Sequence, residues 1–269
     1  MSLRLRQIGL VAPPLEPAVG TLCNALGTTV FYRDPNVAKY GLENAVMPLG
    51  ETFLEVVAPF QDGTAAGRYL IRRAGEGGYM IILETDDIAS WIGQAASVGV
   101  RVAADLDCPG EYRGLQLHPR DTGGPLLEIN WSASDTYHPA GPDWRGGSAS
   151  PAIVGATVQA DGPAAVASRW SDILRRPARD GAIALDSGVI RFVPASDGRG
   201  EGLAGIDVAG LAWPAGESRM LCGTKVCSLR SIPPVRGHLQ WLWSTLHRRV
   251  HRPSRMWPRH GRHGRPGLC

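Results

Sequence analysis

The 269-residue sequence has no apolar run approaching the roughly 18 residues that a membrane-spanning helix needs, which argues against a transmembrane protein. Basic Arg4 and Arg6 stand near the N-terminus, but Pro13, Pro14 and Glu16 interrupt any signal-peptide core. The five cysteines are scattered and odd in number, which argues against a secreted disulfide framework. We therefore expect a cytoplasmic protein with no membrane partner.

Motifs of several enzyme classes are missing from the sequence. It contains neither a Walker-type nor a dinucleotide-binding glycine motif, and its 34 glycines fall mostly between expected strands. No Cys-His or Ser-His grouping is present to activate a nucleophile. The sequence therefore does not favour an enzyme that uses covalent catalysis or binds nucleotides.

Acidic residues are almost absent from the C-terminal part of the chain. Residues 1–211 carry 17 Lys and Arg against 24 Asp and Glu, whereas residues 212–269 carry 11 against the single acid Glu217. The later segment also holds five of the seven histidines and four of the eight tryptophans. We divide the chain at this change of composition.

What the sequence does contain is an internal repeat. Residues 5–11 followed by 52–59, and residues 78–84 followed by 125–130, each give an opening strand and a closing strand. Both closing strands carry a lone glutamate among aliphatic residues, Glu55 in the first and Glu128 in the second. Two copies of one small sheet unit can close on each other around a shared cavity.

The periodicity of apolar residues predicts the elements of each copy. The first has a strand over 3–11, a helix ending at Gly27, a strand over 28–32, a hairpin of 45–49 with 52–57, and a short helix around 68–70. The second has a strand over 79–84, a helix over 88–98, and strands over 100–106, 114–118 and 125–131. A weaker third copy has a strand over 153–159, a helix over 164–174 and a hairpin of 182–185 with 189–193.

A fourth copy begins with a strand over 202–209 but does not continue recognisably. The sequence thus predicts an α+β protein with four parts. These are a paired βαβββ domain over 1–131, a linker over 132–151, a third partial unit over 152–211, and a basic, disordered tail over 212–269.

The segment from His118 to Ile129, which reads His-Pro-Arg-Asp-Thr-Gly-Gly-Pro-Leu-Leu-Glu-Ile, is the most specific motif. It resembles the His-Pro-Lys/Arg…Gly-Gly…Leu-Glu-Leu strand pair of methylmalonyl-CoA epimerases. With the repeat, it identifies the chain as similar to the vicinal-oxygen-chelate superfamily, which includes glyoxalases and bleomycin-resistance proteins. The resemblance covers residues 3–131 well and 152–209 loosely. It implies paired βαβββ modules forming a cupped sheet around a divalent metal.

The same resemblance implies a ligand set. Glu55 and Glu128 fall on the last-strand ligand positions, and Gln7 falls where the first opening strand usually has histidine. Tyr79 replaces the second histidine, and tyrosine is a poor ligand because its pKa is near 10. Such a weak, oxygen-rich site favours Mn²⁺, Mg²⁺ or Ca²⁺, or no metal at all. The family resemblance also leaves Ni²⁺, Zn²⁺ or Fe²⁺ open.

Further residues fall where family pockets are lined. Tyr79, Asn44, Glu43 and Arg68 are candidate substrate contacts, as is His118 at the rim. Arg120 suits an anionic substrate, although it could instead pair with Asp121 across the turn.

For function, the resemblance implies a lyase or isomerase that transfers a proton on a small carbonyl or carboxylate compound, with Glu128 and Glu55 as catalytic residues. A metal-free binding or resistance protein on the same fold is the alternative, favoured by the two missing histidines. A ring-cleaving dioxygenase ranks third, because its Fe(II) site needs both histidines. The third unit either lacks its mate or pairs across a homodimer.

The tail allows several interpretations. The Cys222-x4-Cys227 and His247-x3-His251 pairs are too far apart for a typical zinc finger. The basic run His247–Arg265 could bind nucleic acid or an anionic membrane by charge alone. Outside this tail, no nucleic-acid partner is expected. The abrupt change of composition where a fourth copy should continue suggests a reading-frame change.

Overall fold

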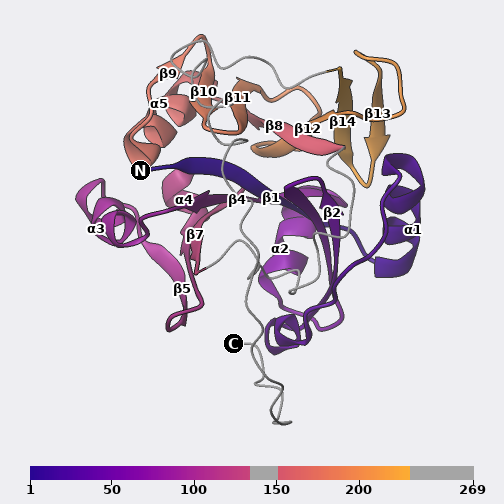
Figure 1. Cartoon of the computed structure of the whole chain (residues 1–269), viewed down its shortest axis with the longest axis horizontal. Coiled ribbons are helices and arrows are strands. Elements are labelled where there is room, and N and C mark those ends of the chain that lie inside the picture. Colours follow the sequence, from indigo (N-terminus) through magenta and orange to yellow (C-terminus); the bar gives the residue numbers. More distant parts are fainter. Residues whose placement is uncertain (134–150, 231–269) are drawn as a thin grey trace, which may run out of the picture.

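The computed structural model describes residues 1–133 and 151–230, and its elements repeat one order four times (Figure 1). The first unit contains β1 (Leu3–Val11), α1 (Leu15–Leu26), the 3-10 helix η1 (Pro35–Tyr40), β2 (Leu42–Leu49) and β3 (Thr52–Pro59), and is followed by α2 (Ala65–Arg72). The second contains β4 (Gly77–Thr85), α3 (Ala89–Ser97), β5 (Val102–Cys108), β6 (Tyr112–Leu117), α4 (Pro119–Thr122) and β7 (Leu126–Ser132). The third contains β8 (Ala152–Ala160), α5 (Pro163–Leu174), β9 (Ala178–Arg179), β10 (Ala182–Leu185) and β11 (Gly188–Pro194). The fourth contains β12 (Gly202–Ala209), β13 (Ser218–Leu221) and β14 (Thr224–Leu229).

Strand pairing shows that the four units form two matched halves. In every unit the last strand pairs parallel with the first, as β3 with β1, β7 with β4, β11 with β8 and β14 with β12. The opening strands then pair antiparallel, β1 with β4 in one half and β8 with β12 in the other. The third unit therefore has its mate within the same chain, and no second copy is needed to complete its sheet.

This arrangement corrects the expectation that an unpaired third unit gives way to a tail after residue 211. β13 and β14 extend the folded chain to residue 229. The fourth unit has no helix and one strand fewer than the second and third, and Pro214 and Gly216 interrupt the short segment between β12 and β13. In place of a helix, the indole of Trp213 packs beside α1 and donates a hydrogen bond of 3.0 Å to the carbonyl of Ala25. The rest of the expected tail and nearly all of the expected linker lie outside the described residues.

A second difference concerns residues 28–32, which were expected to form a strand. They contribute only an isolated bridge between Tyr32 and Val46. The Asp34 carboxylate accepts a hydrogen bond from the Asn36 amide and thereby caps η1, so the chain enters a tight turn instead of continuing a ladder. The remaining expected strands and helices are present, with ends shifted by a few residues.

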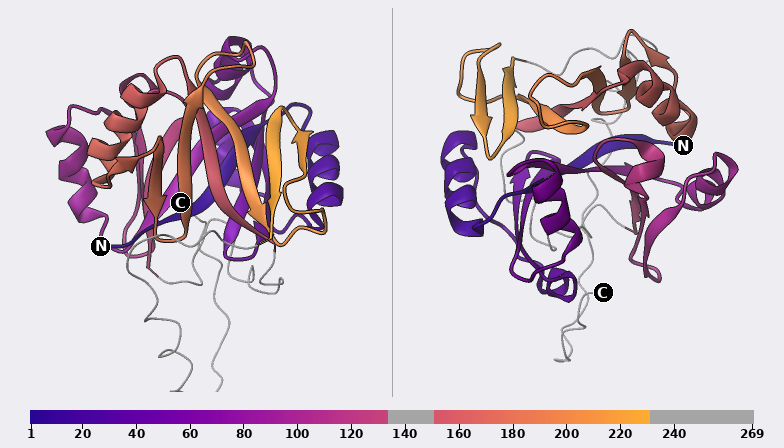
Figure 2. Two further views of the ribbon diagram at one scale, coloured as in Figure 1. Left: turned by 90° about the horizontal axis from the view of Figure 1, so that it is seen from above. Right: turned by 180° about the vertical axis from the view of Figure 1, so that it is seen from behind.

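The main apolar core lies between the two half-sheets, which stack one over the other with α1 and α3 at opposite sides (Figures 1 and 2). Trp91 of α3 and Trp170 of α5 are fully buried there, and the Trp170 indole donates to the carbonyl of Thr122 at 3.0 Å. In the first half, β2 and β3 on one side and β5 to β7 on the other project away from the second half (Figure 1). The concave face of the first sheet therefore points away from the core. None of the helices in the described residues combines the length and apolar character needed to cross a membrane.

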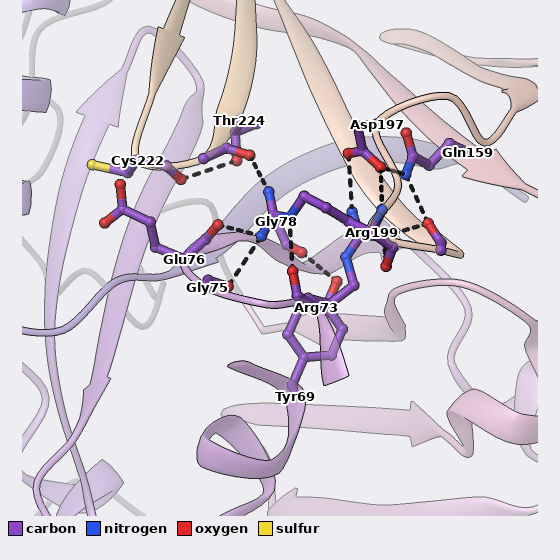
Figure 3. A network of polar contacts seen from close by, with 12 residues as sticks. Tyr69, Arg73, Gly75, Glu76, Gly78, Gln159, Asp197, Arg199, Cys222 and Thr224 are labelled. Atoms are coloured by element: carbon purple, nitrogen blue, oxygen red, sulfur yellow. Dashed lines mark hydrogen bonds and ion pairs between the residues drawn. The ribbon is translucent and has the colours of Figure 1, made fainter. Parts of the chain in front are cut away.

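Two arginines join the two halves of the molecule (Figure 3). Arg73, at the end of α2, is buried and donates to the carbonyls of Arg199 and Gly200. Arg199 donates in return to the carbonyls of Arg73, Gly75, Glu76 and Gly223. Guanidinium groups suit this role because they present several donors in a fixed fork.

Direct backbone pairing also crosses this junction, where Gly78 of β4 pairs with Leu203 of β12. A Cβ atom at Gly78 would lie 2.5 Å from the Leu203 side chain, so only glycine allows this close approach. The Tyr69 hydroxyl donates to the Gly78 carbonyl, and the Tyr69 ring packs edge-on against Tyr79 at 5.1 Å between centroids. Through Tyr69, the junction between the halves therefore contacts Tyr79 of β4.

Candidate active site

The concave face of the first half encloses a cavity of about 570 Å³. Both units contribute to it, through β1 and β3 of the first and β4, β6 and β7 of the second. The polar side chains that line it are those of Gln7, Tyr32, Asp34, Asn36, Lys39, Tyr40, Asn44, Glu55, Tyr79, Asp105, Asp107, Cys108, Tyr112, Gln116, Glu128 and Asn130. This volume is typical of sites for small organic molecules.

Glu55 enters the cavity from β3 and is held by two amides. The Gln7 amide donates to one carboxylate oxygen at 2.8 Å, and the Asn44 amide donates to the other at 2.6 Å. Burial raises the pKa of Glu55, the two amide hydrogen bonds oppose that rise, and the nearby charge of Glu128 adds to it. Its remaining exposed surface faces the cavity. Glu55 is therefore an acid–base group whose protonated form is favoured by its surroundings.

Glu128 enters from β7, which occupies the equivalent place in the second unit. Its carboxylate accepts hydrogen bonds from the Tyr112 hydroxyl at 2.5 Å and from the Gln116 amide at 3.0 Å. It is 3% exposed. The pKa of Tyr112 lies well above its usual value, because the phenol is buried and beside Glu128, so the proton stays on the phenol.

Tyr79 reaches the cavity because of an irregularity in the β1–β4 ladder. Gly9 pairs with Met80 and Leu10 pairs with Gly78, so Tyr79 lies in a bulge that turns its side chain toward the concave face. Burial raises its pKa and keeps the phenol neutral. Its hydroxyl has no hydrogen-bond partner within residues 1–133 and 151–230, and so is a free donor toward the cavity.

Not all the residues that the sequence suggested come together here. Glu55, Glu128, Gln7, Asn44 and Tyr79 all line the one cavity. The remaining four candidates, His118, Arg120, Glu43 and Arg68, do not line it.

The remaining four have other surroundings. His118 caps α4 and accepts a hydrogen bond from the Arg120 amide, and the Arg68 side chain donates to the Gly63 carbonyl. Glu43 and Arg120 are exposed. The suggested pairing of Arg120 with Asp121 is not formed, because Asp121 binds Arg101 through two hydrogen bonds that lower the pKa of the Asp121 carboxyl.

Sequence reasoning missed the partners of Glu128, which are Tyr112, Gln116 and Asn130. The alternation of side chains along β6 and β7 could have revealed them. Asn130 lies two residues after Glu128, and Gln116 pairs directly with Glu128 between β6 and β7, so these side chains share the concave face.

The donor set does not fit a divalent metal. Each oxygen of Glu55 and Glu128 already accepts a hydrogen bond from a neutral donor, and the two opening-strand positions hold an amide and a neutral phenol instead of histidines. Within the described residues no group of three or more His, Cys, Asp or Glu side chains could hold a metal ion. We therefore derive no chemical step through a metal.

Comparison with known proteins places this geometry in a family. The glyoxalase-like domain profile matches residues 8–174. Human mitochondrial methylmalonyl-CoA epimerase is 26% identical over 128 residues, which are 47% of this chain and 72% of that protein. The ethylmalonyl-CoA/methylmalonyl-CoA epimerase of Cereibacter sphaeroides is 26% identical over 129 residues, 47% of this chain and 96% of that protein.

A solved structure shares the fold of both halves. A hypothetical protein from Staphylococcus aureus superposes with a TM-score of 0.62 over 85% of this chain and 99% of its own, at 15% identity. That likeness confirms the α+β architecture of cupped, strand-rich sheets. The repeat, the paired carboxylates and the matched profile together show that the chain belongs to the glyoxalase-like domain family of the vicinal-oxygen-chelate superfamily.

Proposed function

We propose that the protein is an isomerase that moves a proton at a carbon next to a carbonyl group, using Glu55 and Glu128 and no metal. The observation that carries this proposal is the placement of two carboxylates, from equivalent strands of two units, around one cavity. Neither carboxylate has an ion-pair partner among the described residues. A carboxylate in such surroundings is well suited to exchange protons with a bound molecule.

The two carboxylates have complementary surroundings. Hydrogen bonds from Tyr112 and Gln116 hold Glu128 in place in the cavity, and we assign it as the base. Burial favours the protonated form of Glu55, which makes it the proton donor. In one turnover Glu128 takes the proton from one face of the carbon, and Glu55 returns its own proton to the other face. Exchange with solvent then restores the starting protonation of both residues.

The negative charge that develops on the carbonyl oxygen needs a donor. The Tyr79 hydroxyl suits this role, since it lines the cavity, stays protonated and is not used by other described side chains. A positioned neutral donor stabilises such an oxyanion. Tyr69 packs against Tyr79 and thereby limits where its ring can lie.

Solvent exchange at the reacting carbon tests the proposal. The full chain is incubated in D₂O with methylmalonyl-CoA, the substrate in the names of the related epimerases, and separately with small uncharged and charged ketones. Proton NMR then follows loss of the signal from the carbon next to the carbonyl. We expect Glu128→Gln and Glu55→Gln each to slow enzyme-dependent exchange by about 10²–10⁴-fold. Glu43→Gln, an exposed glutamate outside the cavity, is the matched control and should leave the rate unchanged.

A metal-free binding protein on the same fold is the second candidate. The absence of histidine from both opening strands favours it, because a binding protein needs shape and hydrogen bonds but no electrophile. Tight binding of a compound whose carbon-bound protons never exchange with deuterium would support this candidate against the isomerase.

A further inference from the structure

The charge of the cavity points to one class of substrate. Among the described residues that line it are five carboxyl groups, those of Asp34, Glu55, Asp105, Asp107 and Glu128, and one basic side chain, that of Lys39. Arg113 pairs with Asp105 through hydrogen bonds of 3.1 and 2.8 Å and also lies 3.9 Å from an Asp107 oxygen, so these two acids share one cation. Without Glu55, which holds its proton in the proposed mechanism, four carboxylates remain against the cations Lys39 and Arg113, so the cavity keeps an excess of acceptors and of negative charge.

A buried acceptor adds a second, independent observation. Asn130 is 1% exposed and lines the cavity, and its side-chain oxygen, which is itself buried, has no hydrogen-bond partner among the described residues. The orientation of this amide is fixed by its neighbours, because its nitrogen lies 3.3 Å from the Tyr112 hydroxyl and 3.5 Å from a Glu128 oxygen. Turning the amide over would place its oxygen against the Glu128 carboxylate. An unpaired buried acceptor costs stability unless a ligand supplies a donor.

Tyrosines also line the cavity. Four of the six tyrosines in the sequence, Tyr32, Tyr40, Tyr79 and Tyr112, line this one cavity. The faces of aromatic rings attract organic cations. Carboxylates, a free amide oxygen and phenol rings are together a set suited to an ammonium group, and they are poorly suited to carboxylate or phosphate.

We infer that the substrate of this site is a small carbonyl compound that carries an ammonium group. This inference rests on the proposed function, because it assigns the substrate class of the same cavity. It separates this protein from the related epimerases, whose names give anionic coenzyme A thioesters as substrates. The ammonium group donates to Asn130 and to the carboxylates near it, while the carbonyl oxygen lies toward Tyr79.

The test is a titration with three matched three-carbon ketones and one thioester. Aminoacetone is cationic, hydroxyacetone is neutral, and pyruvate and methylmalonyl-CoA are anionic. We expect the full chain to bind aminoacetone at least about tenfold more tightly than hydroxyacetone, with no measurable binding of the two anions, and we expect added NaCl to weaken the preference. Equal or tighter binding of pyruvate or methylmalonyl-CoA would overturn the inference.

A charge variant gives the site-specific control. Asp34→Asn keeps the side-chain oxygen that caps η1 and removes one negative charge from the cavity, so aminoacetone affinity should fall about fivefold. Asp161→Asn, an exposed acid outside the cavity, should leave it unchanged. An unchanged affinity in Asp34→Asn, or stoichiometric Mg²⁺ or Mn²⁺ binding that displaces aminoacetone, would contradict an ammonium site.

Binding and proton exchange separate the two proposals. If the chain prefers aminoacetone but catalyses no deuterium exchange, the ammonium site stands and the isomerase does not. If exchange occurs equally on all three ketones without a preference for the cation, the isomerase stands and the ammonium site does not.

Discussion

The guanidinium of Arg199 donates to the backbone carbonyl of Arg73, and the guanidinium of Arg73 donates to the backbone carbonyl of Arg199, each at 2.8 Å. These two residues are more than a hundred positions apart in sequence and belong to different halves of the molecule. Because each arginine satisfies the carbonyl of the other, neither half can move here without leaving a polar group of the other unpaired. The relationship ties the second half to α2, which packs beside the candidate active site.

We predict that Arg199→Ala destabilises the protein by about 3 kcal/mol, because four backbone carbonyls lose a charged donor at once. The free energy of unfolding from urea titration measures this loss. Arg179→Ala is the matched control, since Arg179 is exposed and makes no side-chain hydrogen bond or ion pair within the described residues. If both variants lose equal stability, the junction does not hold the halves together.

Much of the fold was predictable because the copies of the repeat share one periodicity of apolar residues. Paired units, their opening strands and their helices follow directly from it. Only the opening strand of the fourth unit was predicted. This unit has no helix, so the pattern that identified the other three was incomplete. The alternation of buried Thr224, Val226 and Ser228 with more exposed Lys225 and Cys227 was present, but the basic composition around it pointed away from a strand.

The site was predictable only in part. Glu55 and Glu128 could be found because a lone carboxylate in an aliphatic strand is unusual. Tyr79 could be placed only by resemblance, since a bulge, which the sequence does not reveal, turns it toward the cavity. Asp34 and Lys39 reach the cavity from η1 and its N-cap, a segment for which the sequence predicted no element. Tertiary packing decided these positions.

The raised pKa of Glu55 predicts how stability depends on pH. Its pKa in the folded state lies above the usual value near 4.5, so the folded protein holds this proton more tightly than the unfolded chain does. The contribution of Glu55 to stability is therefore complete below about pH 4.5 and is lost as the pH rises through the folded-state pKa. Glu55→Gln has no such proton, and its neighbouring amides can reorient to pair with the new amide.

As the pH is raised from 4.5 to 8, the free energy of unfolding of Glu55→Gln should therefore increase relative to that of the native sequence. Urea titrations at each pH measure the difference. Glu43→Gln controls for the loss of one glutamate, since Glu43 is exposed, and its difference from the native sequence should stay flat. A flat difference for Glu55→Gln as well would show that Glu55 titrates as an ordinary surface carboxyl.

Tyr112→Phe tests the support of Glu128. This change removes the hydroxyl that donates at 2.5 Å to the buried carboxylate and leaves the ring in place. We expect a loss of about 2 kcal/mol in the free energy of unfolding, since hydrogen bonds to charged groups contribute more than neutral ones. We also expect slower deuterium exchange on any ketone that the native protein turns over. Tyr40→Phe, at an exposed tyrosine on the cavity rim, should cost little stability. Equal stabilities of the two variants would exclude a structural role for the Tyr112 hydroxyl.

Metal analysis decides whether the paired carboxylates work alone. The full chain is the right sample, because β14 of the fourth unit pairs with β12 and truncation at residue 211 would remove it. Purified without chelator and offered Mn²⁺, Ni²⁺, Zn²⁺, Fe²⁺ and Mg²⁺ in turn, the protein should hold far less than one equivalent of any of them, and EDTA should change neither its melting temperature nor its exchange rate. The reason is that Gln7, Asn44, Tyr112 and Gln116 already donate to the oxygens a metal would need. One equivalent of metal that disappears in Glu128→Gln would show instead that these amides turn over to admit an ion, and the reaction would then need an electrophile that the carboxylates do not supply.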